Sequence, residues 1–521
     1  MSARVHPGET PASRRGMVLV IVLVVIAVLA LGAYAFAELM VTQRAAARMS
    51  GRQLQARALA DSGVDALRVL LAKSRDERGA SGGVYNNTQQ FQGITVINDP
   101  DAMERGKFTV LAPNLDQNDQ LAGIRYGLED ESARLNLNLL LVADKKMEGT
   151  GRTLLKGLPG MTDETADAIL DFMDEDEEPR EYGCEAEYYS GLTPPYSPAN
   201  RPLVTVEELL LVRGVTPELL FGYDVNRNGM IDPQEMPPGG AGSNDVSTQL
   251  GWSPFLTLSS KESNVNGADE PRININQDDL QALYQQLTER LGNDAWASYI
   301  VAYRQFGPAS SMGRATTWPG LEIDFNRAGN TKFGQVLDLI GSQVQVQGGQ
   351  GGNQLFSSPF SSDLLAMGTY LPVLLDNLSA SDTPVLPGRL NVNQAPKTLL
   401  QAVPGMTEEI LNEILSRRTP EPDVNQPLRR HEAWLLAEGI VTLQEMKSLT
   451  PFLCGGGDVY RAQVVGYFQG GQAASRAEVV LDATESPTRV LLWRDLSHLG
   501  RGYALETLGV DLNGGTTSVG P

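Results

Sequence analysis

The sequence predicts an α+β protein with three parts: an N-terminal transmembrane helix that continues into a long spine, a small antiparallel sheet built from both chain ends, and a large inserted helical domain. Three observations lead to this prediction. Residues 17–37 are apolar and uncharged, short alternating runs lie towards both ends of the chain, and one helical motif occurs twice between them. At 521 residues the chain is long enough for about three folded units.

The composition argues against several classes of function. The 42 Lys and Arg residues against 63 Asp and Glu residues give a formal charge of -21, so most of the surface repels nucleic acid. Three histidines and two cysteines leave little for a zinc site or for His-based catalysis, and we expect no enzyme. Residues 79–83 match G-x-S-x-G but lie in a polar loop, so a hydrolase that uses Ser81 is a weak alternative and the match is interpreted as a false positive.

The N-terminal segment is long enough to cross a membrane. At 1.5 Å per residue, residues 17–37 form a helix of roughly 31 Å, which matches the hydrocarbon thickness of a bilayer. The basic residues before it, Arg4, Arg14 and Arg15, keep the N-terminus in the cytoplasm. The sequence therefore predicts a single-pass protein with the bulk of the chain outside the cytoplasm.

Three interpretations of this segment compete. Residues 33–37 satisfy the small-x-small rule for cleavage of a secretory signal peptide, and a plain signal anchor is the second interpretation. The third is a prepilin-like leader that is cut between Gly16 and Met17. We favour the third because residues 38–73 continue the helix without a proline, whereas a cleaved signal peptide seldom runs on into such a helix.

The remaining chain alternates between strand-rich and helix-rich composition. The predicted parts are the leader 1–16, the transmembrane helix and spine 17–75, a first β region 76–140, a helical domain 141–240, an unrecognised insertion 241–387, a second hairpin unit 388–454, and a C-terminal β region 455–521. The predicted strands are 93–98, 107–112, 124–129, 460–468, 477–482 and 489–493. Residues 237–247 and 341–362 cannot bury enough apolar surface to order themselves, and we expect both to be mobile linkers or decorated insertions.

An internal repeat dominates the helical part. Residues 154–170 align without gaps to residues 399–415 with nine identities in seventeen positions. An Arg-x-Asn-x-Asn lead-in precedes each copy, at 134–138 and at 389–393. The lead-in occurs once more at 272–277, where the sequence indicates a copy of the lead-in alone.

Each copy is expected to form a helix-hairpin-helix, in which a glycine of positive φ makes the turn and Thr162 or Thr407 caps the second helix. In DNA-binding hairpins the amides of this turn hold a phosphate. Here acidic residues follow at once, Asp163 and Glu164 in the first copy, and they would repel it. We therefore expect protein packing and no nucleic acid, and a periplasmic DNA-uptake protein of the competence type is the alternative function.

Residues 224–235 fit the calcium-loop pattern D-x-[DN]-x-[DN]-G-x5-E at every constrained position. Calcium prefers oxygen ligands, with a bidentate glutamate at position 12 and a glycine at position 6 for the sharp turn. The predicted ligands are Asp224, Asn226, Asn228, the Met230 carbonyl, Asp232 and Glu235. Since Met236-Pro-Pro-Gly-Gly cannot continue a helix, we expect a loop fixed by calcium without a conformational switch. A polar turn without metal stays open as the alternative.

A second acidic run begins at Asp171, where a helix is expected to end. Like charges at the negative end of a helix dipole repel one another, so a bound cation is a reasonable offset, although a solvated helix end is the usual explanation. The candidate ligands are Asp171, Asp174, Asp176, Glu178, Glu185 and Glu187.

The two cysteines, Cys184 and Cys454, are candidates for a disulfide in an oxidising compartment.

Taken together, these residues resemble a known family, the K-type minor pseudopilins of bacterial type II secretion systems (general secretion pathway protein K). The matching pieces follow the family's order along the chain: residues 15–17 with the apolar helix, 128–138, the hairpin at Leu158, 171–179, 183–189, 194–196, Asn200, 207–214 and 390–395. Most pilin-like subunits carry a glutamate at the fifth mature position, and K-type subunits lack it. Here that position is Ile21. An unpaired charge would be costly in a filament core, and a subunit at the tip has none above it to pair with.

The resemblance implies a pilin-like spine and sheet with an inserted helical domain, anchored in the inner membrane with its bulk in the periplasm. It implies a subunit at the pseudopilus tip that starts assembly and supports export across the outer membrane. The implied partners are prepilin peptidase, I- and J-type minor pseudopilins and other secretion-system components. Family members bind calcium in the helical domain, which makes the acidic run a candidate site. Residues 240–387 have no counterpart that we recognise.

Overall fold

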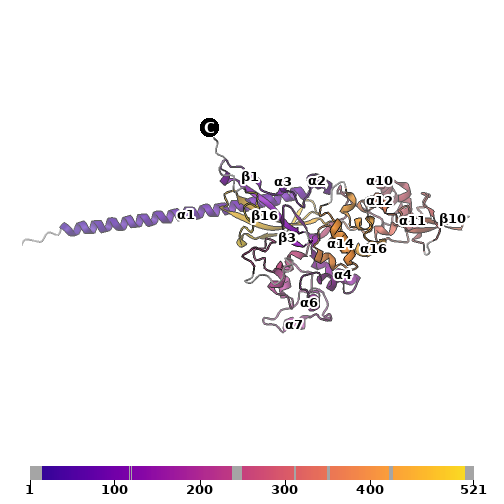
Figure 1. The fold of residues 1–521 in the computed structure, drawn as a ribbon, viewed down its shortest axis with the longest axis horizontal. Coiled ribbons are helices and arrows are strands. Elements are labelled where there is room, and N and C mark those ends of the chain that lie inside the picture. The colour runs from indigo at the N-terminus through magenta and orange to yellow at the C-terminus, as the bar shows by residue number, and fades with distance from the viewer. Residues whose placement is uncertain are drawn as a thin grey trace, which may run out of the picture.

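The structure is a computed structural model that describes residues 15–116, 118, 120–236, 249–309, 313–348, 352–421 and 426–510. A single long helix, α1 (Arg15–Leu71), projects from one end of the molecule, and the sheet and the helical units gather around its far end (Figure 1). Within the described residues α1 is the one helix long and apolar enough to cross a membrane, and none of its apolar stretch is buried.

The second half of α1 is the spine that the sequence predicts. Its buried residues recur at helical spacing, as Ala56, Leu59, Ala60, Val64 and Leu67, and they pack onto the sheet. The approach is close. A Cβ on Gly466 of the sheet would lie 2.2 Å from the Ala56 carbonyl oxygen, so only glycine allows the helix to sit at this distance.

The main sheet is antiparallel and joins the two chain ends, as predicted. Its strand order is β1-β2-β16-β17-β18, while β3 pairs with β2 and β4 pairs with β16. The strands are β1 (Ile94–Ile97), β2 (Gly106–Leu115), β3 (Leu121–Arg125), β4 (Glu129–Asp130), β16 (Val459–Phe468), β17 (Ala474–Asp482) and β18 (Arg489–Asp495). The single strand expected at 124–129 is wrong. The chain breaks between β3 and β4, where Asn87 and Leu128 form backbone hydrogen bonds with Tyr126 and Val84.

The helical part contains three units of one design, each opened by an Arg-x-Asn-x-Asn lead-in. In every unit a two-residue strand in the lead-in pairs in parallel with a strand at the end of the unit, and two helices follow the lead-in. Unit 1 has β5 (Leu135–Asn136), α5 (Thr150–Leu155), α6 (Asp163–Met173) and β6 (Leu256–Thr257); unit 2 has β8 (Ile273–Asn274), α10 (Leu280–Leu291), α11 (Asp294–Phe306) and β12 (Leu378–Ser379); unit 3 has β14 (Leu390–Asn391), α13 (Lys397–Gln401), α14 (Glu408–Arg417) and β15 (Leu453–Cys454).

The two asparagines of the lead-in close each unit. The first accepts a hydrogen bond from the backbone N–H of the second, at 3.1, 2.8 and 2.9 Å in the three units. The second then bonds the backbone of a distant segment of its own unit, as Asn276 does with Phe333 and Ala380. The prediction that residues 272–277 are a lead-in alone is therefore wrong. A complete unit follows, and its sequence does not resemble the other two because its helices turn at Gly292 and Asn293 and lack the Pro-Gly motif.

The described residues 341–348 and 352–362 are ordered, against the prediction of a mobile linker. They contain the hairpin of β10 (Gln343–Gly348) and β11 (Gly352–Ser357), which pairs with β9 (Thr316–Thr317). Val344 and Phe356 are buried there, and Phe356 packs edge-on against Trp318. These few apolar residues at alternating positions are enough to anchor the hairpin. Residues 237–247, the other predicted linker, lie outside the described residues.

Shorter elements connect these parts. The helices are α2 (Arg75–Ala80), α3 (Thr88–Phe91), α4 (Leu140–Lys146), α7 (Ala186–Ser190), α8 (Pro217–Phe221), α12 (Leu364–Asn377), α15 (Trp434–Ala437) and α16 (Leu443–Leu449), and the strands are β7 (Lys261–Ser263) and β13 (Val385–Pro387). One continuous apolar core runs through all three units, so they form a single packed body. A separate core lies between α1 and the sheet.

The two predicted hairpin turns have the expected local chemistry. Gly160 and Gly405 have φ of +68° and +85°, and Thr162 and Thr407 cap the helices that follow. The turn of unit 1 packs against unit 3, since a Cβ on Gly157 would lie 2.8 Å from the Cβ of Ala402. Protein packing inside the chain therefore occupies this turn.

Candidate metal centres

The predicted calcium loop follows α8 and curls back on itself. The two carboxylate oxygens of Asp224 accept hydrogen bonds from the backbone N–H groups of Asn228 and Gly229, at 3.0 and 2.8 Å. The carboxylate of Glu235 accepts from the N–H groups of Asn226 and Asp232, at 2.9 and 3.0 Å. The first and last predicted ligands therefore both fold onto the same turn.

The middle ligands meet inside this turn. The side-chain amides of Asn226 and Asn228 both donate to Oδ2 of Asp232, at 2.7 and 3.1 Å. Gly229, at position 6, has φ of +78°, which confirms the predicted need for glycine. Hydrogen bonds thus tie the five predicted side-chain ligands to one turn, although the carboxylate oxygens of Asp224, Asp232 and Glu235 do not all lie within 4.8 Å of one another. Met230 lies between them in the chain, with its side chain packed on the apolar side of the sheet.

The electrostatics of the loop favour a cation. Asp224 is buried, and burial together with the charge of Glu235 raises the pKa of Asp224 to about 6. Oδ1 of Asn226, a predicted ligand atom, is buried without a hydrogen-bond partner. Both features are relieved if a divalent cation accepts these oxygens as ligands.

The acidic run supplies a second candidate centre, built from three of its six predicted residues. Asp171 lies in the last turn of α6, Asp174 caps the end of α6, and Glu185 precedes α7. All three are buried, and one carboxylate oxygen of each lies within 4.8 Å of the others. Asp176, Glu178 and Glu187 are exposed and do not belong to this group.

The three carboxylates of this second centre are only partly neutralised. Arg180 donates to Asp171 and Asp174 at 2.7 and 2.5 Å, and sequence reasoning missed this arginine although it directly follows the acidic run. Both oxygens of Glu185 and Oδ1 of Asp174 are buried without a hydrogen-bond partner. Burial and the nearby aspartates raise the pKa of Glu185 to about 7. Oxygen ligands that lack partners and repel one another are a fit for calcium.

The other predicted site residues lie apart from both centres. Gly16 and Met17 are in the first turns of α1. Cys184 and Cys454 are both buried free thiols, so the candidate disulfide is not formed. Their surroundings differ, since Cys184 contacts the Tyr189 hydroxyl and Cys454 the Arg389 carbonyl, each at 3.4 Å.

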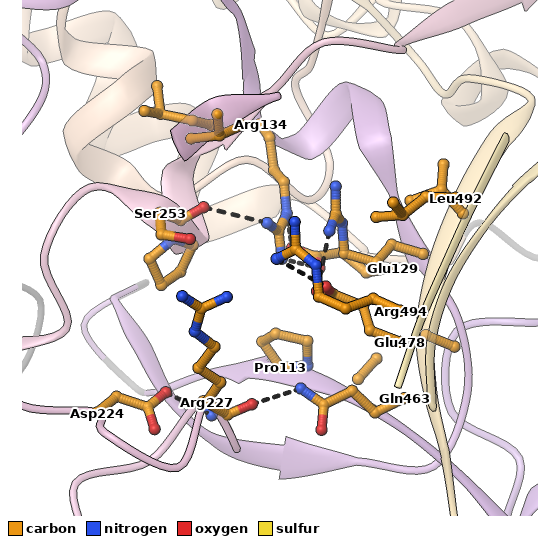
Figure 2. Close-up of a pocket in the computed structure, with 18 of the residues that line it drawn as sticks. Pro113, Glu129, Arg134, Asp224, Arg227, Ser253, Gln463, Glu478, Leu492 and Arg494 are labelled. Atoms are coloured by element: carbon orange, nitrogen blue, oxygen red, sulfur yellow. Dashed lines mark hydrogen bonds and ion pairs between the residues drawn. The ribbon is translucent and has the colours of Figure 1, made fainter. Parts of the chain in front are cut away.

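The loop also forms one wall of a cavity of about 190 Å³ between unit 1 and the main sheet (Figure 2). Ion pairs line the cavity: Arg134 binds Glu129, and Arg494 binds Glu207 at 2.8 Å. Arg227, at position 4 of the loop, points into it and lies 3.4 Å from Glu207. The charges are paired within the cavity, so its chemistry is that of a polar interface.

Ser81, the weak nucleophile candidate, directly follows the helix α2 and donates to the Glu77 carbonyl, which is not the geometry of a nucleophile elbow.

Comparison with known proteins supports the resemblance over the segment that holds the second centre. Residues 133–221 match the family model described as Type II secretion system (T2SS), protein K. The type II secretion system protein K of Aeromonas hydrophila is 48% identical over 54 residues, which are 10% of this chain and 16% of that protein. A relative from Escherichia coli (strain K12), whose description also names type II secretion system protein K, is 40% identical over 57 residues, or 11% of this chain and 17% of that protein. The matched stretch thus spans about one sixth of the length of these relatives.

A solved structure, the GspK-GspI-GspJ complex from the type 2 secretion system of enterotoxigenic Escherichia coli, aligns over 88% of this chain and 98% of its own chain. The identity is 12% and the TM-score is 0.36. The family model and the two relatives confirm the resemblance to protein K of type II secretion, and they do not favour the DNA-uptake alternative.

Proposed function

We propose that this chain is a K-type minor pseudopilin, anchored in the inner membrane with its bulk in the periplasm. In this role it sits at the tip of the type II secretion pseudopilus, starts assembly with I- and J-type partners and supports protein export. The observation that carries the proposal is the match of residues 133–221 to the protein K family, because this segment contains the lead-in, the hairpin and the acidic centre of unit 1. The solvent-exposed apolar half of α1 supports it.

The N-terminus has the chemistry that such a subunit needs. A prepilin peptidase would cut between Gly16 and Met17, where the basic leader meets the apolar helix. Ile21 then stands at the fifth mature position, so the membrane segment of α1 carries no charge that must find a partner in the filament. This property suits a subunit that has no neighbour above it.

We also propose that the chain binds calcium at two centres. In the loop the ligands would be Asp224, Asn226, Asn228, the Met230 carbonyl, Asp232 and Glu235. In the acidic centre they would be Asp171, Asp174 and Glu185, with Arg180 holding two of the carboxylates in place. Bound calcium would supply positive charge to the buried oxygens of both centres, and the carboxylates already lie close together in the acidic centre.

The secretion role is tested by complementation of a host strain that lacks its K-type subunit. The full chain should restore export, and in detergent it should copurify with the co-encoded I- and J-type proteins. A matched control is a chain in which the leader glycine is replaced, Gly16→Ala, because it folds alike but should not be processed. The proposal fails if export stays absent while the processed chain accumulates in the membrane and neither partner copurifies.

A further inference from the structure

Unit 1 and the main sheet meet through a mixed interface and not through one continuous apolar core. The core of the helical units and the core on this face of the sheet are separate clusters. The cavity shown in Figure 2 lies between them, and its walls carry ion pairs such as Glu207 with Arg494. The position of unit 1 on the sheet therefore depends on a limited number of specific polar contacts.

The calcium loop provides a concentrated group of these contacts. Three consecutive backbone carbonyls of the loop accept hydrogen bonds from three side chains of the sheet and of the C-terminal segment. The bonds run from Arg476 to Asn226, from Gln463 to Arg227 and from Tyr503 to Asn228, at 2.5, 2.6 and 3.1 Å. Two of the donors, Arg476 and Tyr503, are buried, and their other side-chain hydrogen-bond partner is Gln463 of the sheet, at 3.4 and 2.8 Å. Displacement of the loop would therefore leave both donors with fewer hydrogen bonds.

Asn228 belongs to both the loop and the interface. Its side-chain amide donates to the Gly502 carbonyl at 2.7 Å, and the same side chain carries a predicted calcium ligand. The side chain of Met230 packs into the apolar cluster that includes Tyr503 and Leu508. Order inside the loop is thereby coupled directly to order in the C-terminal segment.

The charges of the loop remain compatible with the nearby Arg476 when calcium is bound. Arg476 makes no ion pair among the described residues, and it faces the loop through its bond to Asn226. Loop 224–235 carries three carboxylates, on Asp224, Asp232 and Glu235, and one arginine, Arg227, so its formal charge is -2 and one calcium ion brings it to zero. The guanidinium of Arg476 therefore faces no net positive charge after the cation binds.

From these contacts we infer that loop 224–235 is a calcium-dependent latch that holds unit 1 against the main sheet and the C-terminal segment. The inference rests on the calcium loop of the proposed function. A cation that binds only the ordered loop stabilises every contact that the ordered loop makes, by the factor 1 + [Ca]/Kd. For a Kd of 0.1 to 1 mM, typical of extracellular loops, about 2 mM calcium gives a factor of roughly 3 to 20.

The test is hydrogen–deuterium exchange of the full chain in detergent, in 2 mM calcium and in chelator. Calcium should slow exchange of residues 500–510 about 3- to 20-fold and leave α10 and α11 of unit 2 unchanged. The Glu235→Gln variant should lose this effect, while Glu322→Gln, an exposed carboxylate of unit 2 with the same charge change, should keep it. Tyr503→Phe should still bind calcium at the loop but show less protection of residues 500–510, because one donor to Asn228 is gone.

Calcium titration by calorimetry on the same variants separates the outcomes. If wild type binds one more calcium than Glu235→Gln, but residues 500–510 exchange equally fast with and without calcium, the latch is overturned and the calcium loop stands. If Glu235→Gln binds as many calcium ions as wild type with equal affinity, both the latch and the loop assignment are overturned. Neither result bears on the secretion role, which complementation tests separately.

Discussion

The ionised Glu185 carboxylate should destabilise the folded protein without calcium and stabilise it when calcium is bound. It is buried, both of its oxygens lack partners, and its pKa of about 7 lies above the ordinary value of 4.5. Because the folded pKa is the higher one, the folded state binds the proton more tightly, so the metal-free protein loses stability as pH rises from about 4.5 to 7. At about 1.4 kcal/mol for each pH unit in this window, the full loss is roughly 3 kcal/mol.

The perturbation is Glu185→Gln, which keeps the shape and removes the charge. The buried amide still lacks partners and costs about 1 to 2 kcal/mol, so the variant should be more stable than wild type by about 1 to 2 kcal/mol at pH 8 in chelator. In calcium the order should invert, since the variant loses a charged ligand. At pH 4, where wild-type Glu185 is protonated, the advantage of the variant should disappear.

The assay is chemical denaturation of the full chain in detergent at pH 4 and pH 8, with calcium and with chelator. Glu187→Gln is the matched control, because it makes the same change two residues away on an exposed carboxylate and should be neutral in all conditions. The reasoning is refuted if Glu185→Gln is destabilised in chelator at pH 8 as much as in calcium. Glu185 would then be held by interactions that the variant breaks, and not by an uncompensated charge.

Three further predictions concern other parts of the chain. Glu235→Gln should remove the calcium-dependent part of the stability of the loop, about 0.6 to 1.8 kcal/mol at 2 mM calcium, and thermal melts with calcium and chelator measure it. N-terminal sequencing of the chain expressed with prepilin peptidase should begin at Met17, and a start at Phe36 or Glu38 would contradict the leader. Gly466→Ala should prevent the close packing of α1 on the sheet and lower the melting temperature by many degrees, because the new Cβ meets the Ala56 carbonyl, whereas Gly51→Ala, in open space on the same helix, should be neutral or slightly stabilising.

The fold was predictable where the signal is local or follows a regular period. The apolar segment and the uninterrupted helix after it gave α1, and alternation gave five of the six predicted strands in place. Unit 2 was not found beyond its lead-in, since the feature it shares with the other units is backbone pairing between β8 and β12, and this leaves a trace of only two residues in each strand. The β10–β11 hairpin was missed because the average composition of residues 341–362 hides two well-placed apolar side chains.

The two candidate metal centres also differ in how far their ligands can be predicted from local sequence. The sequence names a candidate ligand at each position of the calcium loop, because its twelve residues are contiguous and each has a fixed place in the turn; calcium binding there stays a prediction. The acidic centre could be predicted only as a region. Which carboxylates meet depends on how the chain returns from Asp174 to Glu185, and Arg180 helps to fix that path through its bonds to two of the aspartates. Charge density alone does not show which acids turn inwards and which stay in solvent.

The pairing of β2 with β16 sets an order for folding. Val464 pairs with Val110, and the two positions are 464 − 110 = 354 residues apart. Until β16 has been synthesised, the apolar face of the spine and one edge of β2 have nothing to cover them, while the three helical units have most of their own residues and can fold. The sheet region that holds the spine is therefore completed last, and this late step is where the chain is most exposed to aggregation or to proteolysis.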